Sequence, residues 1–313
     1  MKRKRTFKKK IRHILEYGGI GLLFLLVRPL SARGVYQLGC ALGKLAHTFS
    51  GRRIQIALTN LDIAFGDAKS PQEKKRIIRK SFMRMTVSAL QILWLHHDTE
   101  KRIYQLFPEK PRGLNILAEG LKRNKGAFFI VAHYGNWEAM GIYLGYLEVL
   151  HLCSIARRLD NPYLEKTTQA FRTCSGNETF YRDDSPLKIV RALKNNSCVA
   201  VMMDQNTAVG GVFVDFFGKK AATPRSVALL SRKLETPILP LFVHPEKNGT
   251  YSIEIKPELK LEKTGDKEKD ILNLTLECQK AIESVVREHP ENWMWVHRRW
   301  KTRPPEEQGK KVY

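Results

Sequence analysis

The sequence has few cysteines, few acids relative to its bases and no long apolar run, and each shortage narrows what the chain can be. Its five cysteines are an odd number among 313 residues and include no C-x-x-C pair. Neither a disulfide framework nor a zinc site is therefore predicted. Unpaired cysteines fit a reducing environment that faces the cytosol. The sequence contains no internal repeat, and its length allows a substantial core.

The shortage of acids leaves a strongly basic chain. There are 31 Asp and Glu against 54 Lys and Arg, which gives a net charge of +23 and a pI near 9.9. Such a surface attracts anions, and four classes fit: nucleic acid, anionic lipid, a phosphorylated substrate or an acidic carrier protein. Charge alone does not choose among them.

The longest apolar run near the N-terminus is short. Residues 2–12 carry eight Lys or Arg and no acid, and the apolar run follows at residues 17–27. As a helix this run is about 16 Å long, against roughly 30 Å of hydrocarbon in a bilayer. A spanning anchor requires Glu16 and Arg28 to snorkel, whereas an anchor lying in the plane of an anionic leaflet fits the basic residues on both flanks slightly better. A signal peptide cleaved near Ser31 is a third interpretation, which the unpaired cysteines downstream disfavour.

The rest of the chain alternates strand-like and helix-like segments. Helices are predicted over residues 35–66, 70–94, 114–123, 162–172, 185–194, 223–234 and 267–288, and strands over residues 126–132, 151–155, 198–203, 238–243 and 251–255, with an apolar hairpin or loop at residues 210–218. This order predicts an α/β fold with a mixed, largely parallel sheet flanked by helices. We expect a basic N-terminus with a membrane-anchoring helix at residues 1–34, a single globular domain at residues 35–304 and a polar tail at residues 305–313.

One stretch, residues 126–141, combines a strand, a turn and the start of a helix. Its apolar run ends at His133, Gly135 and Asn136 form a turn, and Asn136 is a good N-cap for the helix that follows. His133 is thereby placed at the carboxyl end of a buried strand, which is the edge of an α/β sheet where ligands bind.

His133 and Glu138 form the candidate catalytic pair. On one helix five residues turn through roughly 500°, so the two side chains can meet only across the turn. A carboxylate on one imidazole nitrogen would fix the tautomer and leave the other nitrogen free to take a proton. The alternative is a histidine satisfied at a strand end, with a glutamate that only complements the helix dipole.

A second polar group follows another predicted strand. Asp204, Gln205 and Asn206 come directly after residues 198–203. If the strands are parallel, these side chains lie on the same edge as His133.

With these motifs in view, the chain resembles the late acyltransferases of lipid A biosynthesis, the lauroyl and myristoyl transferases. The resemblance runs from the N-terminal apolar segment to the tail and depends on five motifs in order: residues 132–138, residues 161–162 with Arg172 ten residues later, residues 204–205, residues 213–218 followed by 221–223, and residues 294–304. It implies a glycerolipid-acyltransferase-like domain at residues 35–304.

The resemblance also implies a mechanism. His133 would remove the proton from a hydroxyl of a lipid A precursor, which then attacks the thioester of an acyl carrier protein, and Glu138 would orient His133. No metal and no cofactor is expected beyond this acyl carrier co-substrate. The implied location is the bacterial inner membrane, with the catalytic domain facing the cytoplasm.

Further site residues are implied with less definite roles. Arg172 is the first candidate for an oxyanion donor and the backbone near Asn136 the second. Asp204, beside Gln205, would pair with Arg172 or another arginine on the edge of the sheet, or accept from a substrate hydroxyl; the alternative is an aspartate that only forms the turn after a strand. Arg298, among neighbouring arginines and tryptophans, would bind phosphate at a membrane surface, or belong to a packed C-terminal helix with a solvated face.

Two positions depart from the family pattern, and two other functions remain open. Glu165 and Asn206 stand where many relatives carry Asp, which leaves the acceptor more open than the chemistry. One alternative is the same chemistry on a glycolipid, lysophospholipid or aminolipid. The other is a basic membrane or nucleic-acid binding protein, although no nucleic-acid-binding motif is present.

Overall fold

The computed structural model describes residues 2–184, 186–260, 263–307, 309 and 311–313, and only the backbone of residues 2–7. The predicted basic side chains at positions 2 to 5 therefore lie outside the described residues. The described strands form a six-stranded sheet and a separate two-stranded hairpin.

The main sheet is mixed and largely parallel, as predicted. Its order is β3-β2-β4-β1-β7-β8, and every neighbouring pair is parallel except β7 and β8. The strands are β1 (Ala127–Val131), β2 (Leu152–Ala156), β3 (Glu178–Tyr181), β4 (Cys198–Met202), β7 (Ile238–Pro245) and β8 (Tyr251–Ile255). All five residues of β1 are buried, which is typical of a central parallel strand covered on both faces.

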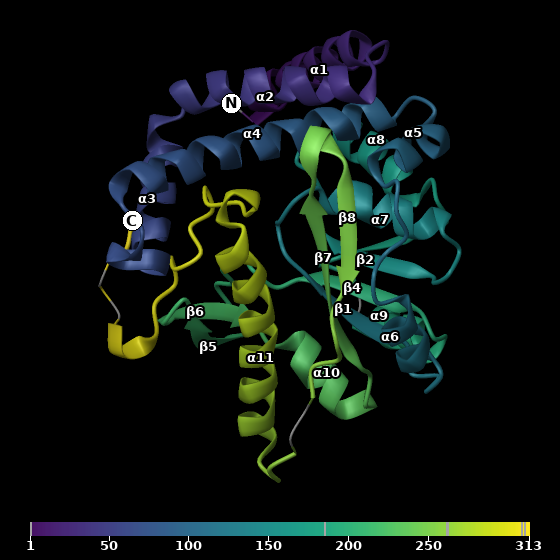
Figure 1. Ribbon diagram of the computed structural model, residues 1–313, viewed down its shortest axis with the longest axis vertical. Coiled ribbons are helices and arrows are strands. Elements are labelled where there is room, and N and C mark those ends of the chain that lie inside the picture. The colour runs from purple at the N-terminus through teal and green to yellow at the C-terminus, as the bar shows by residue number, and fades with distance from the viewer. Residues whose placement is uncertain (1, 185, 261–262, 308, 310) are drawn as a thin grey trace.

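Helices cover both faces of this sheet (Figure 1). One face packs on a core that includes α3, α10 and α11, and the other on a core that includes α5, α6 and α7. The helices after the first are α2 (Ala32–Thr48), α3 (Gly51–Phe65), α4 (Pro71–Leu95), α5 (Thr99–Leu106), α6 (Leu114–Leu121), α7 (Trp137–Tyr146), α8 (Pro162–Thr173), α9 (Pro186–Lys194), α10 (Ser226–Leu234) and α11 (Lys267–Glu288). The hairpin or loop predicted at residues 210–218 covers only the first strand and the turn of a hairpin, because β5 (Gly211–Phe216) pairs with β6 (Lys219–Pro224). Thr223 and Pro224, predicted to begin the next helix, end β6 instead.

The first helix, α1 (Lys2–Val27), lies beside α4 and α8 at one end of the molecule (Figure 1). None of the helices in the described ranges is long and apolar enough to cross a membrane. Helix α1 nevertheless exposes several large apolar side chains, namely Ile11, Ile14, Leu15, Tyr17, Leu22, Leu25 and Leu26.

Several segments differ from the sequence-based expectation. The predicted helix over residues 35–66 is divided into α2 and α3 around Phe49. Strand β3 and helix α5 were not predicted, because four and eight residues are too short to show a clear periodicity. The prediction of a C-terminal helix, or of tryptophans at headgroup level, was wrong. Residues 293–302 are irregular, and Trp293, Trp295 and Trp300 are buried in the core.

Candidate active site

The site is centred on His133 and Asp204, which follow two adjacent parallel strands. His133 comes two residues after β1 and Asp204 two residues after β4. Nδ1 of His133 lies 2.8 Å from Oδ1 of Asp204, and the backbone N–H of His133 donates to Oδ2 at 2.7 Å. The carboxylate therefore fixes both the ring and the main chain of His133.

Asp204 is 1 % exposed and is held as an anion. The Trp293 indole is its third hydrogen-bond donor, with 2.8 Å between Nε1 and Oδ2. Burial by itself would raise the pKa of Asp204, but the charge of His133 and these hydrogen bonds outweigh it and lower the pKa to about 2. The position of Trp293 follows from the C-terminal segment, which forms a bridge between Trp293 and Tyr134 beside the turn after β1.

The partners of the imidazole assign its tautomer. An ionised Asp204 can only accept, so Nδ1 of His133 carries the proton. Nε2 is then an acceptor, and the side-chain amide of Gln205 lies 3.0 Å from it. The arrangement leaves a basic nitrogen whose partner is a neutral amide, which is what a general base needs.

The prediction that Glu138 orients His133 was wrong. Glu138 instead accepts a bidentate pair from Arg172, through Nε at 2.9 Å and through Nη2. Burial would lower the pKa of Arg172, but the hydrogen bonds and charge of Glu138 raise it. The physical reason is that Asp204 already holds Nδ1 of His133, while the planar guanidinium fork of Arg172 matches both carboxylate oxygens of Glu138.

This pair also alters the role predicted for Arg172. The guanidinium is committed to Glu138 and bridges α8 to the first turn of α7. Its Nε and Nη2 groups are used by Glu138, and its predicted role as an oxyanion donor stays a prediction. The expectation that Asp204 pairs with an arginine on the edge of the sheet was wrong, because its hydrogen-bond donors are His133 and Trp293.

Two other predicted site residues, Asn136 and Arg298, make contacts that stabilise the fold. Asn136 is buried and caps α7, accepting from Ala139 N–H at 3.2 Å and donating to Gln91 at 3.3 Å. Arg298 lies 5.8 Å above the Tyr313 ring, outside the cavity that contains His133. Neither contacts the His133 ring in the described structure.

The turn between β1 and α7 depends on a glycine. Gly135 has φ +62°, and a Cβ added there would lie 2.4 Å from the carbonyl oxygen of Val243. Only a residue without a side chain allows the chain to pass β7 this closely. Gly135 therefore fixes the path of the turn, and with it the position of His133 and the start of α7.

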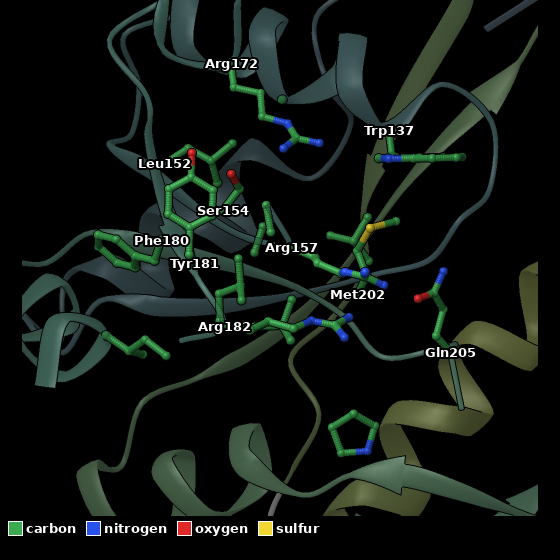
Figure 2. A pocket seen from close by; sticks show the side chains of 18 of the residues that line it. Trp137, Leu152, Ser154, Arg157, Arg172, Phe180, Tyr181, Arg182, Met202 and Gln205 are labelled. Carbon is green, nitrogen blue, oxygen red and sulfur yellow. The ribbon is translucent and has the colours of Figure 1, made fainter. Parts of the chain in front are cut away.

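His133 lines a cavity of about 650 Å³ that extends along the carboxyl ends of the parallel strands. Figure 2 shows other side chains of its wall. Its walls include apolar side chains such as Met140, Leu152 and Met202, and polar ones such as Gln205. Trp137 also lines it, with its ring 5.0 Å from the His133 ring in an edge-on arrangement. In the described ranges no group of three His, Cys, Asp or Glu side chains could hold a metal ion.

A basic histidine held by a buried carboxylate beside a cavity with an apolar wall suits acyl transfer, and comparison with known proteins points the same way. The family model for the bacterial lipid A biosynthesis acyltransferases matches residues 2–302. The chain belongs to this family.

Three relatives illustrate its range. A lipid A biosynthesis lauroyltransferase of Escherichia coli (strain K12) is 28 % identical over 300 residues, which cover 94 % of this chain and 93 % of the relative. A lipid A biosynthesis palmitoleoyltransferase of the same strain is 27 % identical over 298 residues, with 94 % and 93 % covered. A phosphatidylinositol mannoside acyltransferase of Mycobacterium tuberculosis (strain CDC 1551 / Oshkosh) is 24 % identical over 192 residues, with 60 % and 58 % covered.

Sequence reasoning on this family member missed several residues of the site. Trp293 was placed either at a membrane surface or in a packed C-terminal helix, and Trp137 was noted only as part of the helix start. Arg157 and Arg182, which line the cavity, were not singled out. The ends of β2 and β3 carry these arginines, so a correct prediction of β3 would have placed Arg182 on the same edge as His133.

Proposed function

We propose that this acyltransferase moves a fatty acyl chain from an acyl carrier protein thioester to a hydroxyl of a lipid A precursor, with His133 as the general base. The observation that carries the proposal is the His133–Asp204 pair, which leaves Nε2 as a basic nitrogen on the cavity side. The names of the E. coli relatives support the acceptor.

The reaction begins when the acceptor hydroxyl takes the place of the Gln205 amide at Nε2 of His133. Nε2 removes the hydroxyl proton as the oxygen attacks the thioester carbonyl carbon, and Asp204 stabilises the imidazolium that forms. The C–S bond then breaks, and the leaving sulfur takes the proton from His133. The His133 imidazole is thereby returned to its neutral starting state without any added reactant.

The negative charge that develops on the carbonyl oxygen needs a donor close to His133. Gln205 is our first candidate, because its amide already lies at Nε2 and carries two N–H groups. Once the hydroxyl displaces it from Nε2, the amide would donate to the carbonyl oxygen. Arg172 contributes indirectly, by holding Glu138 and with it the start of α7.

The acyl chain would occupy the apolar part of the cavity. Met140, Ile142 and Leu152 lie on its walls together with Phe180 and Met202. Burying methylene groups against such a wall contributes about 0.8 kcal/mol each. The depth of this part of the cavity would therefore set the preferred chain length.

Binding at the cytoplasmic face of the inner membrane fits the surface of α1. Its exposed apolar residues accompany basic ones at positions 8, 9, 10 and 12. We propose that α1 lies in the plane of the bilayer, with its apolar side chains among the headgroups and its lysines on anionic lipid. The net charge of +23 would also attract an acidic carrier protein.

The decisive experiment is mass spectrometry of lipid A from a host that lacks its own late acyltransferases. We expect the gene to add the mass of one acyl chain and the His133→Ala variant to add none, although it accumulates to the same level in the membrane. A mass increase that persists in His133→Ala would overturn the mechanism.

A second acceptor class is supported by the mycobacterial relative, whose name specifies phosphatidylinositol mannoside. The same chemistry on another glycolipid would leave lipid A unchanged and add an acyl chain elsewhere in the lipid extract. Analysis of the whole extract, with and without His133→Ala, separates the two acceptors.

A further inference from the structure

The charged residues of the cavity wall do not balance. Besides His133, the wall carries three arginines and two acids: Arg157, Arg172, Arg182, Glu138 and Asp184. Glu138 is taken by Arg172. Asp184 accepts from Lys188 at 3.1 Å and from Tyr181 N–H at 2.9 Å, and these contacts lower its pKa. Neither acid of the cavity wall therefore pairs with Arg157 or Arg182.

The two remaining arginines have little to neutralise them. Among the described residues no acid pairs with the Arg182 side chain, which is exposed. Arg157 reaches Asp160 at 3.4 Å, but the two side chains are 74 % and 77 % exposed, so solvent screens this pair. The neighbouring Arg158 is different, because it stacks on Tyr181 and pairs with Asp183.

Their positions follow from the sheet. Arg157 comes directly after β2 and Arg182 directly after β3, and these strands are parallel neighbours. In Figure 2 both guanidinium groups extend in the same direction, toward Gln205. They therefore share the carboxyl edge that carries His133, on the side away from β7.

The order of the strands gives an approximate distance between the backbone of each arginine and the end of β1, where His133 lies. In the order β3-β2-β4-β1, β2 lies two strands from β1 and β3 lies three. With about 4.8 Å between neighbouring strands, the two positions are roughly 10 and 14 Å from the end of β1. These are separations between backbones, and the arginine side chains extend from them toward Gln205, so a group bound there can belong to the substrate that reacts at His133.

We infer that Arg157 and Arg182 form a subsite for a phosphate group of a bound substrate. This inference deepens the proposed function and rests on it. Two guanidinium groups, one with no acidic partner among the described residues and one in a solvent-screened pair, match the charge and the several oxygens of a phosphate, whereas a carboxylate would need only one fork. The source is a phosphate on the acceptor lipid or a phosphodiester in the acyl donor.

The test compares steady-state kinetics of the full chain in detergent micelles on two acceptors. One is a phosphorylated lipid A precursor, and the other is the same lipid after phosphatase treatment. The variants are Arg157→Gln, Arg182→Gln and the double variant. The matched control is Arg191→Gln, an exposed arginine of α9 that lies outside the cavity.

For the double variant we expect the KM for the phosphorylated acceptor to rise about tenfold or more, with kcat within about twofold of wild type. The KM for the dephosphorylated acceptor should be the same in both proteins. A rise in the KM for the acyl donor instead would support the subsite and assign it to the donor. Unchanged values for both substrates, or an equal effect of Arg191→Gln, would overturn it.

A binding measurement separates this inference from the proposed function. Titration calorimetry with the His133→Ala protein needs no turnover. Tighter binding of the phosphorylated than of the dephosphorylated lipid, lost in the added Arg157→Gln and Arg182→Gln changes, supports the subsite whatever reaction the enzyme performs. Equal binding of the two lipids by that protein contradicts the acceptor as the source. Wild-type KM values for both substrates in the active double variant contradict the subsite alone and leave the proposed reaction standing.

Discussion

Asp204 accepts three hydrogen bonds in a nearly dry position, so its charge is fixed before any substrate binds. Because the carboxylate needs no rearrangement when His133 becomes charged, it stabilises the imidazolium at full strength. We expect Asp204→Asn to lower kcat by about 10³-fold or more, as amide replacements do in comparable triads. Steady-state turnover, with circular dichroism as a check on folding, measures the effect. A loss of less than tenfold would contradict this role.

The same carboxylate makes stability depend on pH. Its pKa of about 2 in the folded protein lies below the unfolded value near 3.9. The stabilisation is therefore complete above about pH 5 and is lost as the pH falls toward 2. Between pH 5 and pH 3 we expect wild type to lose roughly 1 kcal/mol more in the free energy of unfolding than Asp204→Asn. Urea titrations at both pH values provide the comparison, and equal losses would refute the assignment.

Glu138 and Arg172 should behave as one unit. Removing either partner leaves the other charged and partly buried, so we expect Glu138→Gln and Arg172→Gln each to lower kcat/KM about tenfold. The double variant should be no worse than the more damaged single variant. Losses that multiply in the double variant would show that Glu138 acts on His133 independently of Arg172.

The sequence predicted His133 but not its partner, and the reason is physical. A strand that ends at a histidine is visible over a few residues. The Asp204 contact joins residues 71 positions apart and depends on β4 lying next to β1, which the local pattern does not specify. Glu138 was chosen because it is near in sequence. Arg172 was found only through its motif, since nothing local shows that the end of α8 faces the start of α7.

At the scale of elements, the turn from β1 into α7 is the most constrained piece of the site. Gly135→Ala must place a methyl group against the Val243 carbonyl in a left-handed conformation. We expect the free energy of unfolding to fall by about 2 kcal/mol or more and kcat to fall at least tenfold as His133 shifts. Gly176→Ala is the matched control, because φ is +82° there and the space is open. Similar losses in both variants would contradict the role of the close approach.

Elements were predicted well where their pattern is long. The 22 residues of α11 and the capping box that begins α4 were both found, because apolar periodicity and end signals agree there. Strand β3 was missed, having four residues of which one is fully buried. Because β3 was not predicted, the sheet was expected to have one strand fewer, and Arg182, which follows β3, was not placed on its carboxyl edge.

At the scale of the molecule, charge and the surface of α1 act together. Leu22, Leu25 and Leu26 are 62, 59 and 59 % exposed. Replacing all three with Ser should lower the partition coefficient onto anionic vesicles by about tenfold or more, since each loses apolar area that the bilayer would bury. The control changes Val209 and Leu272, exposed residues outside α1, to Ser. Co-sedimentation measures both, and equal binding by all three proteins would contradict an in-plane anchor.

The His133–Asp204 contact also has a consequence for how the chain reaches its native state. Between the two residues the chain must complete α7, β2, α8, β3 and α9 and return to pair β4 alongside β1. Parallel pairing at this separation is slow, since loop closure precedes any stabilising contact. The general base is thus assembled only when the centre of the sheet closes, and recovery of turnover during refolding reports that closure rather than the earlier formation of helices.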